Sequence, residues 1–374
     1  MRVCFFIAEM EGFGGTQRAS STIANALAAM PDVSEVMLLG LMGHAESSFV
    51  LHERIKSESL FKKCGPMTSR YPIAVHRLRK YLQRNHVDVL VVVESSLSFY
   101  AIPARFGLKT RLICWEHFNF NADGGRKKRV VARYLAAMFA DDVVTLTRRD
   151  QALWEQRTCT RANIGAIANP VGQLNYEPIY PVGSRTVLAV GRLDHQKGFD
   201  ILLEAWACVV ERDHAASWNL VIVGNGELRK SLDEQIVRLD LDRSVTIHPA
   251  TSDIRSKYAQ AAIVCCSSRY EGLPMVLIEA QQHGVPVVSF DVDTGPREIV
   301  LNGETGLLVP PEDRESLANA LCDLMSDERK RSAMSKSAIR HSTRFHTENV
   351  IEHWRRLLAL PSSTCESVDC GHAS

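Results

Sequence analysis

Short apolar runs alternate with amphipathic stretches along most of this 374-residue chain, and this alternation constrains the fold more than any other feature. In the first half the runs are RVCFFIA, EVMLLGL, VDVLVVVE, TRLICWE and DDVVTLT. They are short, rich in β-branched residues and bounded by Gly, Asp or Pro, which favours buried strands over helices. Strands that alternate with helices predict a parallel sheet covered on both faces. Residues 51–71 are irregular and are assigned no element.

A break at residues 169–184 divides the chain, because NPVGQLNYEPIYPVGS contains three prolines and two glycines and is typical of an interdomain linker. The alternation then restarts with RTVLAVG, NLVIVG, SVTIHP, AAIVCCSS, PVVSFD and GLLVP. We therefore expect two Rossmann-like, doubly wound domains, at residues 1–170 and 183–345. A helix at about 347–360 is expected to cross back onto the first domain, and residues 361–374 to form a disordered polar tail.

Charge is divided unevenly between the two halves. Residues 1–182 contain 23 Lys and Arg against 16 Asp and Glu, a net +7 in a chain whose total is +1. Summed charge of this kind steers association with an anionic partner rather than setting the fold. The ten cysteines include no Cys-x-x-Cys pair, and several lie in apolar runs, so we expect reduced thiols in the cytoplasm. The opening MRVCFFIAEMEGFGG is unlike a secretory signal.

The most specific signal is SRYEGLPMVLIEAQ at residues 268–281, in which Glu271 and Glu279 lie eight positions apart. Glu271 belongs to a strand-to-helix loop, and Glu279 lies about two turns along the helix that follows. The neighbours of Glu279 include Leu277 and Ile278, so this carboxylate is expected to be buried and to need a partner. Carboxylates in a cleft of this kind can accept hydrogen bonds from sugar hydroxyls.

A second signal is VGRLDHQKGFD, which follows a strand ending at Val190. Arg192 and Lys197 lie five positions apart there, on a loop flanked by Gly191 and Gly198. Two fixed cations suit a diphosphate, and they can stabilise the charge that builds on a departing diphosphate without a metal.

Three further loops are expected at the same cleft. Gly224 and Gly226 follow a strand in VGNGELRKSL, and Gly15 opens a helix whose first turns contain Arg18. Backbone amides at such a helix start can face a phosphate. His117 follows the strand TRLICWE at its carboxyl end.

SRYEGLPMVLIEA resembles the two-glutamate signature of the retaining glycosyltransferases of family four, and the similarity extends over nearly the whole chain. The resemblance implies a GT-B fold, in which two Rossmann-like domains face each other across a cleft. The first domain would bind the acceptor and the second the nucleotide sugar. It implies that Glu279 binds the ribose hydroxyls of the donor and that Glu271 contacts the transferred sugar. The backbone at Leu273, Pro274 and Met275 would contact the same donor.

The resemblance also gives roles to the other loops. Arg192, Lys197 and His117 would act in catalysis together with Glu271. Gly15, Gly224 and Gly226 would bind the donor. Arg18 would bind the acceptor. Asp291 and Asp293 form an Asp-x-Asp pattern, which other glycosyltransferases use with manganese. Their place beside TGPRE resembles a structural loop of the family instead, so no metal and no other cofactor is expected.

These features predict transfer of a hexose or N-acetylhexosamine, with retention, from a UDP-sugar. The acceptor is expected to be a saccharide or lipid-linked saccharide of a bacterial surface polysaccharide such as lipopolysaccharide. The basic segments at residues 76–84 and 126–139 could hold the protein on the inner face of the cytoplasmic membrane, or form only the solvated rims of core helices. No aromatic stacking motif accompanies the basic half, so nucleic acid is not an expected partner.

Two alternatives remain open at this point. One is a sugar-nucleotide epimerase or phosphorylase on the same fold, and the other is a non-enzymatic module that binds nucleotide sugars. An NAD dehydrogenase is disfavoured, because neither half has Gly-x-Gly-x-x-Gly after its first strand with an acidic residue about 20 positions later.

Overall fold

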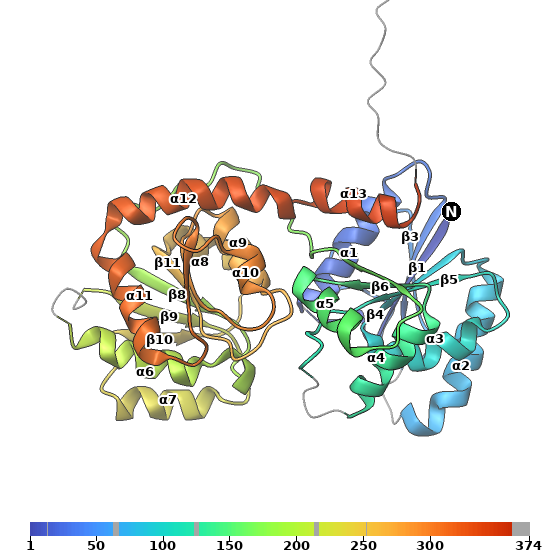
Figure 1. The fold of residues 1–374 in the computed structure, drawn as a ribbon, viewed down its shortest axis with the longest axis horizontal. Helices are drawn as coiled ribbons and strands as arrows, with labels where there is room; N and C mark the ends of the chain where they lie inside the picture. Colours follow the sequence, from blue (N-terminus) through green and yellow to red (C-terminus); the bar gives the residue numbers. More distant parts are fainter. Residues whose placement is uncertain (13, 63–66, 123–126, 213–216, 252, 361–374) are drawn as a thin grey trace, which may run out of the picture.

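The computed structural model describes residues 1–12, 14–62, 67–122, 127–212, 217–251 and 253–360. The predicted tail at 361–374 and the start of the second basic segment lie outside these residues. The described chain forms two α/β domains side by side, each with a parallel sheet between helices, as the alternating pattern predicts (Figure 1).

The first sheet has seven strands in the order β3-β2-β1-β4-β5-β6-β7, all parallel. Its strands are β1 (Arg2–Ile7), β2 (Glu35–Gly40), β3 (Ile55–Ser59), β4 (Val89–Val93), β5 (Arg111–Trp115), β6 (Asp142–Thr145) and β7 (Asn163–Ala166). The helices between them are α1 (Gly15–Ala28), α2 (Met67–Arg84), η1 (Ser95–Leu97), α3 (Ser98–Arg105), α4 (Lys127–Phe139) and α5 (Arg148–Arg157).

The second sheet has six parallel strands in the order β10-β9-β8-β11-β12-β13. Its strands are β8 (Thr186–Val190), β9 (Asn219–Val223), β10 (Val245–His248), β11 (Ile263–Cys266), β12 (Val287–Phe290) and β13 (Gly306–Val309). The helices are η2 (His195–Lys197), α6 (Phe199–Val210), α7 (Arg229–Arg238), α8 (Ile254–Gln260), α9 (Met275–Gln282), α10 (Pro296–Ile299), α11 (Arg314–Ser326), α12 (Glu328–Ser342), η4 (Thr343–Phe345) and α13 (Thr347–Leu357).

Burial explains why the apolar runs became strands. All five residues of β4 and all four of β11 are buried, since central parallel strands are covered by helices on both faces. Every apolar run predicted as a strand is a strand. The pattern missed only the two edge strands of the first sheet, β3 and β7, whose residues are mostly half-buried or exposed.

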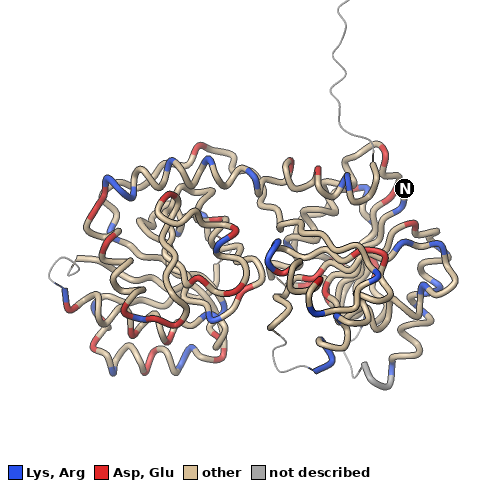
Figure 2. The backbone as a smooth tube through the Cα atoms, in the orientation of Figure 1, with Lys and Arg blue, Asp and Glu red and all other residues tan. Residues whose placement is uncertain are grey.

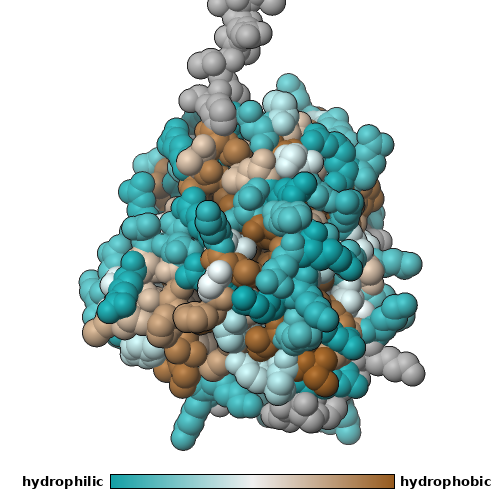
Figure 3. Space-filling view, turned by 90° about the vertical axis from the view of Figure 1, so that its right-hand side faces the viewer, coloured by the Kyte–Doolittle hydropathy of each residue, from teal (hydrophilic) through white to brown (hydrophobic). Residues whose placement is uncertain are grey.

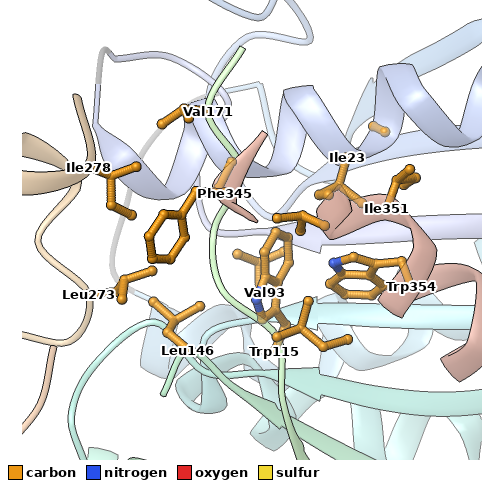
Figure 4. Packing of buried hydrophobic residues seen from close by; sticks show 14 of the residues in the cluster. Ile23, Val93, Trp115, Leu146, Val171, Leu273, Ile278, Phe345, Ile351 and Trp354 are labelled. Atoms are coloured by element: carbon orange, nitrogen blue, oxygen red, sulfur yellow. The ribbon is translucent and has the colours of Figure 1, made fainter. Parts of the chain in front are cut away.

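The end of the chain crosses both domains. In Figure 1, α12 runs along the second domain and α13 along the first. Trp354 of α13 is fully buried, and its ring centroid lies 4.8 Å from that of Trp115 and 6.2 Å from that of Phe5. Figure 4 shows Phe345, from the segment between these helices, beside Ile278 of the second domain. One buried apolar cluster therefore continues from one domain into the other.

The strand order reverses at one place in each sheet, between β1 and β4 and between β8 and β11. In doubly wound sheets, ligands bind outside the carboxyl ends of the strands at such a reversal. The loops after β1, β8 and β11 contain predicted site residues, and His117 and the pair Gly224 and Gly226 follow β5 and β9, each next to a strand at the reversal.

Candidate functional site

The loop after β8 directs Lys197 toward Glu271. Gly198 ends η2 at φ +61°, and a Cβ at this position would lie 2.1 Å from the Ser267 carbonyl oxygen. Only glycine fits both the left-handed conformation and this close approach. The turn brings Lys197 Nζ to 2.6 Å from Glu271 Oε1.

The Lys197–Glu271 ion pair is almost removed from solvent, with side-chain exposures of 15% and 7%. Burial alone would lower the pKa of Lys197, but the adjacent Glu271 carboxylate outweighs it and raises that pKa. Arg192 is not part of this pair. Its side chain is 70% exposed and contacts Asp194 at 3.1 Å and Gln196 at 3.0 Å within its own loop.

Glu279 lies on α9 between partners from both domains. Its Oε1 accepts a hydrogen bond from Arg18 Nη1 of α1 at 2.5 Å, and its Oε2 accepts one from the Tyr258 hydroxyl of α8 at 2.8 Å. Burial raises the pKa of Glu279, against the opposing influence of Arg18 and Tyr258. The residue predicted to bind ribose and the residue predicted to serve the acceptor are therefore ion-paired with each other.

The start of α9 faces the first domain. Pro274 is its N-cap residue and has no N–H, so it offers a carbonyl and ring atoms but cannot donate a hydrogen bond. Leu273 is 7% exposed and belongs to the shared apolar cluster. A Cβ on Gly15, the first residue of α1, would lie 3.8 Å from Met275 Cγ, so the predicted donor-binding residues on the two sides lie close together.

Gly224 and Gly226 allow two backbones to touch. A Cβ on Gly224 would lie 1.8 Å from the Gly191 carbonyl oxygen, and one on Gly226 would lie 2.3 Å from that of Leu193. The same loops share backbone hydrogen bonds, including Leu193 N to the Asn225 carbonyl oxygen at 2.9 Å. These glycines join the loop after β9 to the loop that carries Arg192 and Lys197.

His117 follows β5 and lies against the second domain. Its side chain is buried, its ring centroid lies 4.5 Å from that of Trp115, and burial lowers its pKa to about 3. The imidazole is therefore neutral at physiological pH. A Cβ on Gly272 would lie 2.5 Å from the His117 carbonyl oxygen, so the loop that carries Glu271 packs directly on the loop that carries His117.

A buried polar scaffold that sequence reasoning missed supports the His117 loop. Glu116 Oε1 accepts the backbone N–H groups of His117 at 3.0 Å and Phe118 at 3.1 Å, and Glu116 Oε2 accepts the Ser95 hydroxyl at 2.5 Å. Arg133 of α4 lies 3.5 Å from the same carboxylate and donates to backbone carbonyls of this loop. The side chains of Glu116 and Arg133 are almost completely buried. The basic sequence around Arg133 gives no local sign of that burial.

Glu94 is a second residue that the sequence did not single out. It follows β4 at the reversal of strand order in the first sheet. Its backbone φ is +78°, a conformation that residues other than glycine rarely adopt. Arg129 lies 3.8 Å from its carboxylate and places its guanidinium 3.9 Å from the centre of the Phe118 ring. Arg129 thus joins the loop after β4 to the loop after β5.

The Asp-x-Asp pair is engaged in ion pairs. Asp291 contacts Arg297 at 2.5 Å, while Asp293 contacts Arg149 at 3.0 Å and Asn121 at 2.8 Å across the domain boundary. Over the ranges that the structure describes, no group of three or more His, Cys, Asp or Glu side chains is arranged to hold a metal ion. Independence from metals stays a prediction.

Comparison with known proteins identifies the family. Residues 178–341 match the family described as glycosyl transferases group 1. An uncharacterized glycosyltransferase of Haemophilus influenzae is 33% identical over 358 residues, which cover 96% of this chain and 99% of that protein. A Campylobacter jejuni protein is 27% identical, covering 96% of this chain and 98% of its own. That relative is named GalNAc-alpha-(1->4)-GalNAc-alpha-(1->3)-diNAcBac-PP-undecaprenol alpha-1,4-N-acetyl-D-galactosaminyltransferase.

A solved structure agrees on the fold. Anabaena HepE, crystallised in complex with UDP and glucose, superimposes with a TM-score of 0.81 at 21% identity, covering 96% of this chain and 99% of that one. The GT-B arrangement predicted from the sequence is thus confirmed. Because it matches this family over residues 178–341 and a glycosyltransferase of H. influenzae over nearly the full length of both proteins, this chain belongs to the group 1 glycosyl transferases.

Proposed function

We propose that this protein transfers a hexose or N-acetylhexosamine, with retention of configuration, from a UDP-sugar to a saccharide or lipid-linked saccharide. One observation carries the proposal. Lys197 and Glu271 form an ion pair at the strand-order reversal of the second sheet, and the loop of Glu271 packs on that of His117. The helix that follows, α9, carries Glu279 and starts close to Gly15 of the first domain. Cations, a helix start and carboxylates in that arrangement suit a diphosphate, a sugar and a ribose.

The proposed chemistry places charge stabilisation on the second domain. The donor diphosphate lies at the start of α9 and near Lys197 and Arg192, which stabilise its developing negative charge. The bond from the anomeric carbon to the diphosphate oxygen breaks, and a bond to the acceptor oxygen forms on the same face. The departing diphosphate oxygen takes the acceptor proton, and UDP leaves.

A front-face path of this kind needs no enzymic nucleophile. Glu116, whose carboxylate accepts the backbone N–H of His117, is already held by Ser95, Arg133 and the backbone N–H of Phe118. Neutral His117 is suited to a hydrogen bond with a hydroxyl of the transferred sugar. No step in this scheme uses a metal ion, so we expect transfer to survive chelation with EDTA.

The acceptor is proposed from the Campylobacter relative, whose name gives it a saccharide acceptor on a lipid pyrophosphate. Glu94, Arg129 and Phe118 lie on the acceptor side, where a carboxylate and an aromatic ring suit sugar hydroxyls and ring faces. Assembly of a bacterial surface polysaccharide is the process that fits such an acceptor.

A lipid-linked acceptor favours contact with the cytoplasmic face of a membrane. Val131, Tyr134 and Phe139 of α4 are 47% to 51% exposed, and Lys127 and Lys128 are exposed at the start of the same helix. Figure 2 shows basic residues there, and Figure 3 shows apolar patches on the outer end of the first domain. Among the described residues, no helix is long and apolar enough to cross a bilayer. Flotation with vesicles of phosphatidylglycerol and phosphatidylcholine tests this peripheral contact.

Thermal unfolding in the presence of UDP, GDP, ADP or CMP tests the proposed donor. A ligand that binds only the folded protein raises its apparent stability, so UDP should raise Tm and the other nucleotides should not. Glu279→Ala should strongly reduce the shift, whereas Glu234→Ala, an exposed control on α7, should keep it. A shift with none of the nucleotides would contradict the proposal. Conversion of the UDP-sugar to another nucleotide sugar would favour the epimerase alternative. Release of the sugar only when phosphate is present would favour the phosphorylase alternative.

A further inference from the structure

The carboxylate of Glu279 is shared between the domains. Arg18 lies 261 positions earlier in the chain, yet its Nη1 is 2.5 Å from Glu279 Oε1. The side chain of Glu279 is 14% exposed and that of Arg18 is 42% exposed. Glu279 is therefore nearly buried, while Arg18 is partly exposed to solvent and has room to move away.

The other oxygen of the same carboxylate is held from within the second domain. Tyr258 is fully buried, and its hydroxyl donates to Glu279 Oε2 at 2.8 Å. Its ring stacks on His283 with centroids 4.9 Å apart, and His283 Nδ1 lies 2.8 Å from the Glu279 carbonyl oxygen. Tyr258 is thus locked in place by packing, so Oε2 has a permanent donor whatever Arg18 does.

A ribose bound to Glu279 meets these two partners differently. Arg18 is 42% exposed and Tyr258 is fully buried, so Arg18 is the partner that an incoming ligand can displace. A ribose hydroxyl therefore reaches Oε1, the oxygen that Arg18 contacts. Two hydroxyls and a guanidinium cannot all occupy the outer side of one nearly buried carboxylate. Tyr258 lies on the opposite oxygen and does not block that approach.

We infer that Arg18 and the ribose of the donor compete for Glu279, and that Tyr258 is a positioning residue that holds Glu279 for either of them. This inference rests on the proposed function, because it takes the donor to be a nucleoside diphosphate sugar. It adds an interdomain contact that donor binding must break. Arg18 then sets donor affinity from the acceptor domain.

The two residues should move donor affinity in opposite directions. Arg18→Gln removes the competing cation, so UDP should bind about two- to fivefold more tightly, the range expected for a partly exposed ion pair. Tyr258→Phe removes a hydrogen bond to a charged group while keeping the packed ring, so UDP should bind about tenfold more weakly. Arg149→Gln breaks a different interdomain ion pair, the one with Asp293, and should leave UDP affinity unchanged.

Isothermal titration of the full chain and its three variants with UDP and with 2′,3′-dideoxy-UDP tests the inference. With dideoxy-UDP, which lacks the ribose hydroxyls, Arg18→Gln, Tyr258→Phe and the unmodified protein should bind equally, whereas a loosened fold would weaken both ligands. Tighter UDP binding by Arg18→Gln, lost with dideoxy-UDP, supports competition. Weaker or unchanged UDP binding by Arg18→Gln overturns it. Failure of the unmodified protein to bind UDP overturns the proposed function itself.

Discussion

Lys197 Nζ lies 2.6 Å from Glu271 Oε1, so the cation proposed for the donor diphosphate already has an anionic partner within the second domain. Lys197→Met removes this cation and leaves Glu271 buried without its partner. We expect kcat to fall by about 10²- to 10³-fold, as when one preorganised electrostatic group is lost. Breaking the buried pair should also lower the free energy of unfolding by about 3 kcal/mol, measured by urea denaturation.

The double variant Lys197→Met with Glu271→Gln separates these two effects. Without a buried unpaired charge, most of the lost stability should return, while kcat should stay low. Recovery of transfer together with stability would show that the pair acts only through folding.

Gly272 marks a close approach between the loop that carries Glu271 and the loop that carries His117. Gly272→Ala places a Cβ 2.5 Å from the His117 carbonyl oxygen, which forces the second domain away from the first. We expect a loss of kcat of at least about tenfold, because small misplacements of reacting groups are costly, with little change in UDP affinity. Gly165→Ala is the control, since its Cβ would meet nothing within 4 Å. Equal kcat for the two variants would contradict a role for this contact.

Trp354 links the crossing helix to the His117 region through Trp115, with ring centroids 4.8 Å and then 4.5 Å apart. Trp354→Ala should reduce the free energy of unfolding by about 3 to 5 kcal/mol, as for other large buried aromatic side chains. Trp354→Phe should lose less, because it keeps part of the packed ring. UDP affinity should stay near that of the unmodified protein in both variants, since the donor is proposed to bind the second domain. A large loss of UDP affinity in Trp354→Phe would contradict this division.

Asp150 gives a pH dependence to stability. Burial raises the pKa of this carboxyl from 3.8 to about 7, with Glu116 adding to the shift and the Phe120 N–H and Arg133 opposing it. The folded protein keeps the proton up to about pH 7, whereas the unfolded chain releases it near pH 4. The folded state binds more protons between these values, so the contribution of Asp150 to stability falls as pH rises through this window.

Asp150→Asn should remove that fall, because the amide does not titrate and its Oδ1 can still accept the Phe120 N–H. Urea denaturation at pH 5 and pH 8 measures this effect. Between these pH values the free energy of unfolding of the variant should rise relative to that of the unmodified protein, by an amount on the order of a few kcal/mol. Parallel pH dependence in the two proteins would mean that Asp150 ionises normally.

The fold was predictable because central parallel strands carry a continuous apolar signal. β4 and β11 are completely buried, and each is a continuous run of apolar residues in the sequence. β3 was missed because it is a sheet edge with the sequence IKSES, whose four consecutive polar residues are half-buried or exposed. β7 is also an edge strand, with the sequence NIGA, and it has no buried residue either. An edge strand depends on a neighbour that is distant in sequence, so its own residues carry little information.

The sequence predicted which residues belong to the candidate site better than it predicted which of them contact each other. Motif spacing brought Glu271, Glu279 and Lys197 to one strand reversal, but no local pattern reveals that Arg18 meets Glu279 across 261 positions. Tyr258 lies on a short helix outside every motif, and Arg133 looks like one more residue of a basic surface helix. Long-range hydrogen bonds of this kind are set by packing, which becomes visible only in the folded chain.

Proton NMR of a UDP-sugar during slow enzymatic hydrolysis tests most directly the claim that transfer retains the anomeric configuration. Water replaces the unidentified acceptor in this reaction. The anomeric configuration of the released sugar is recorded before the two anomers equilibrate. Retaining transfer predicts that the α-anomer appears first, that free UDP accumulates in equal amount, and that Lys197→Met releases neither. First appearance of the β-anomer would contradict retention and the front-face path drawn from Lys197, Glu271 and His117.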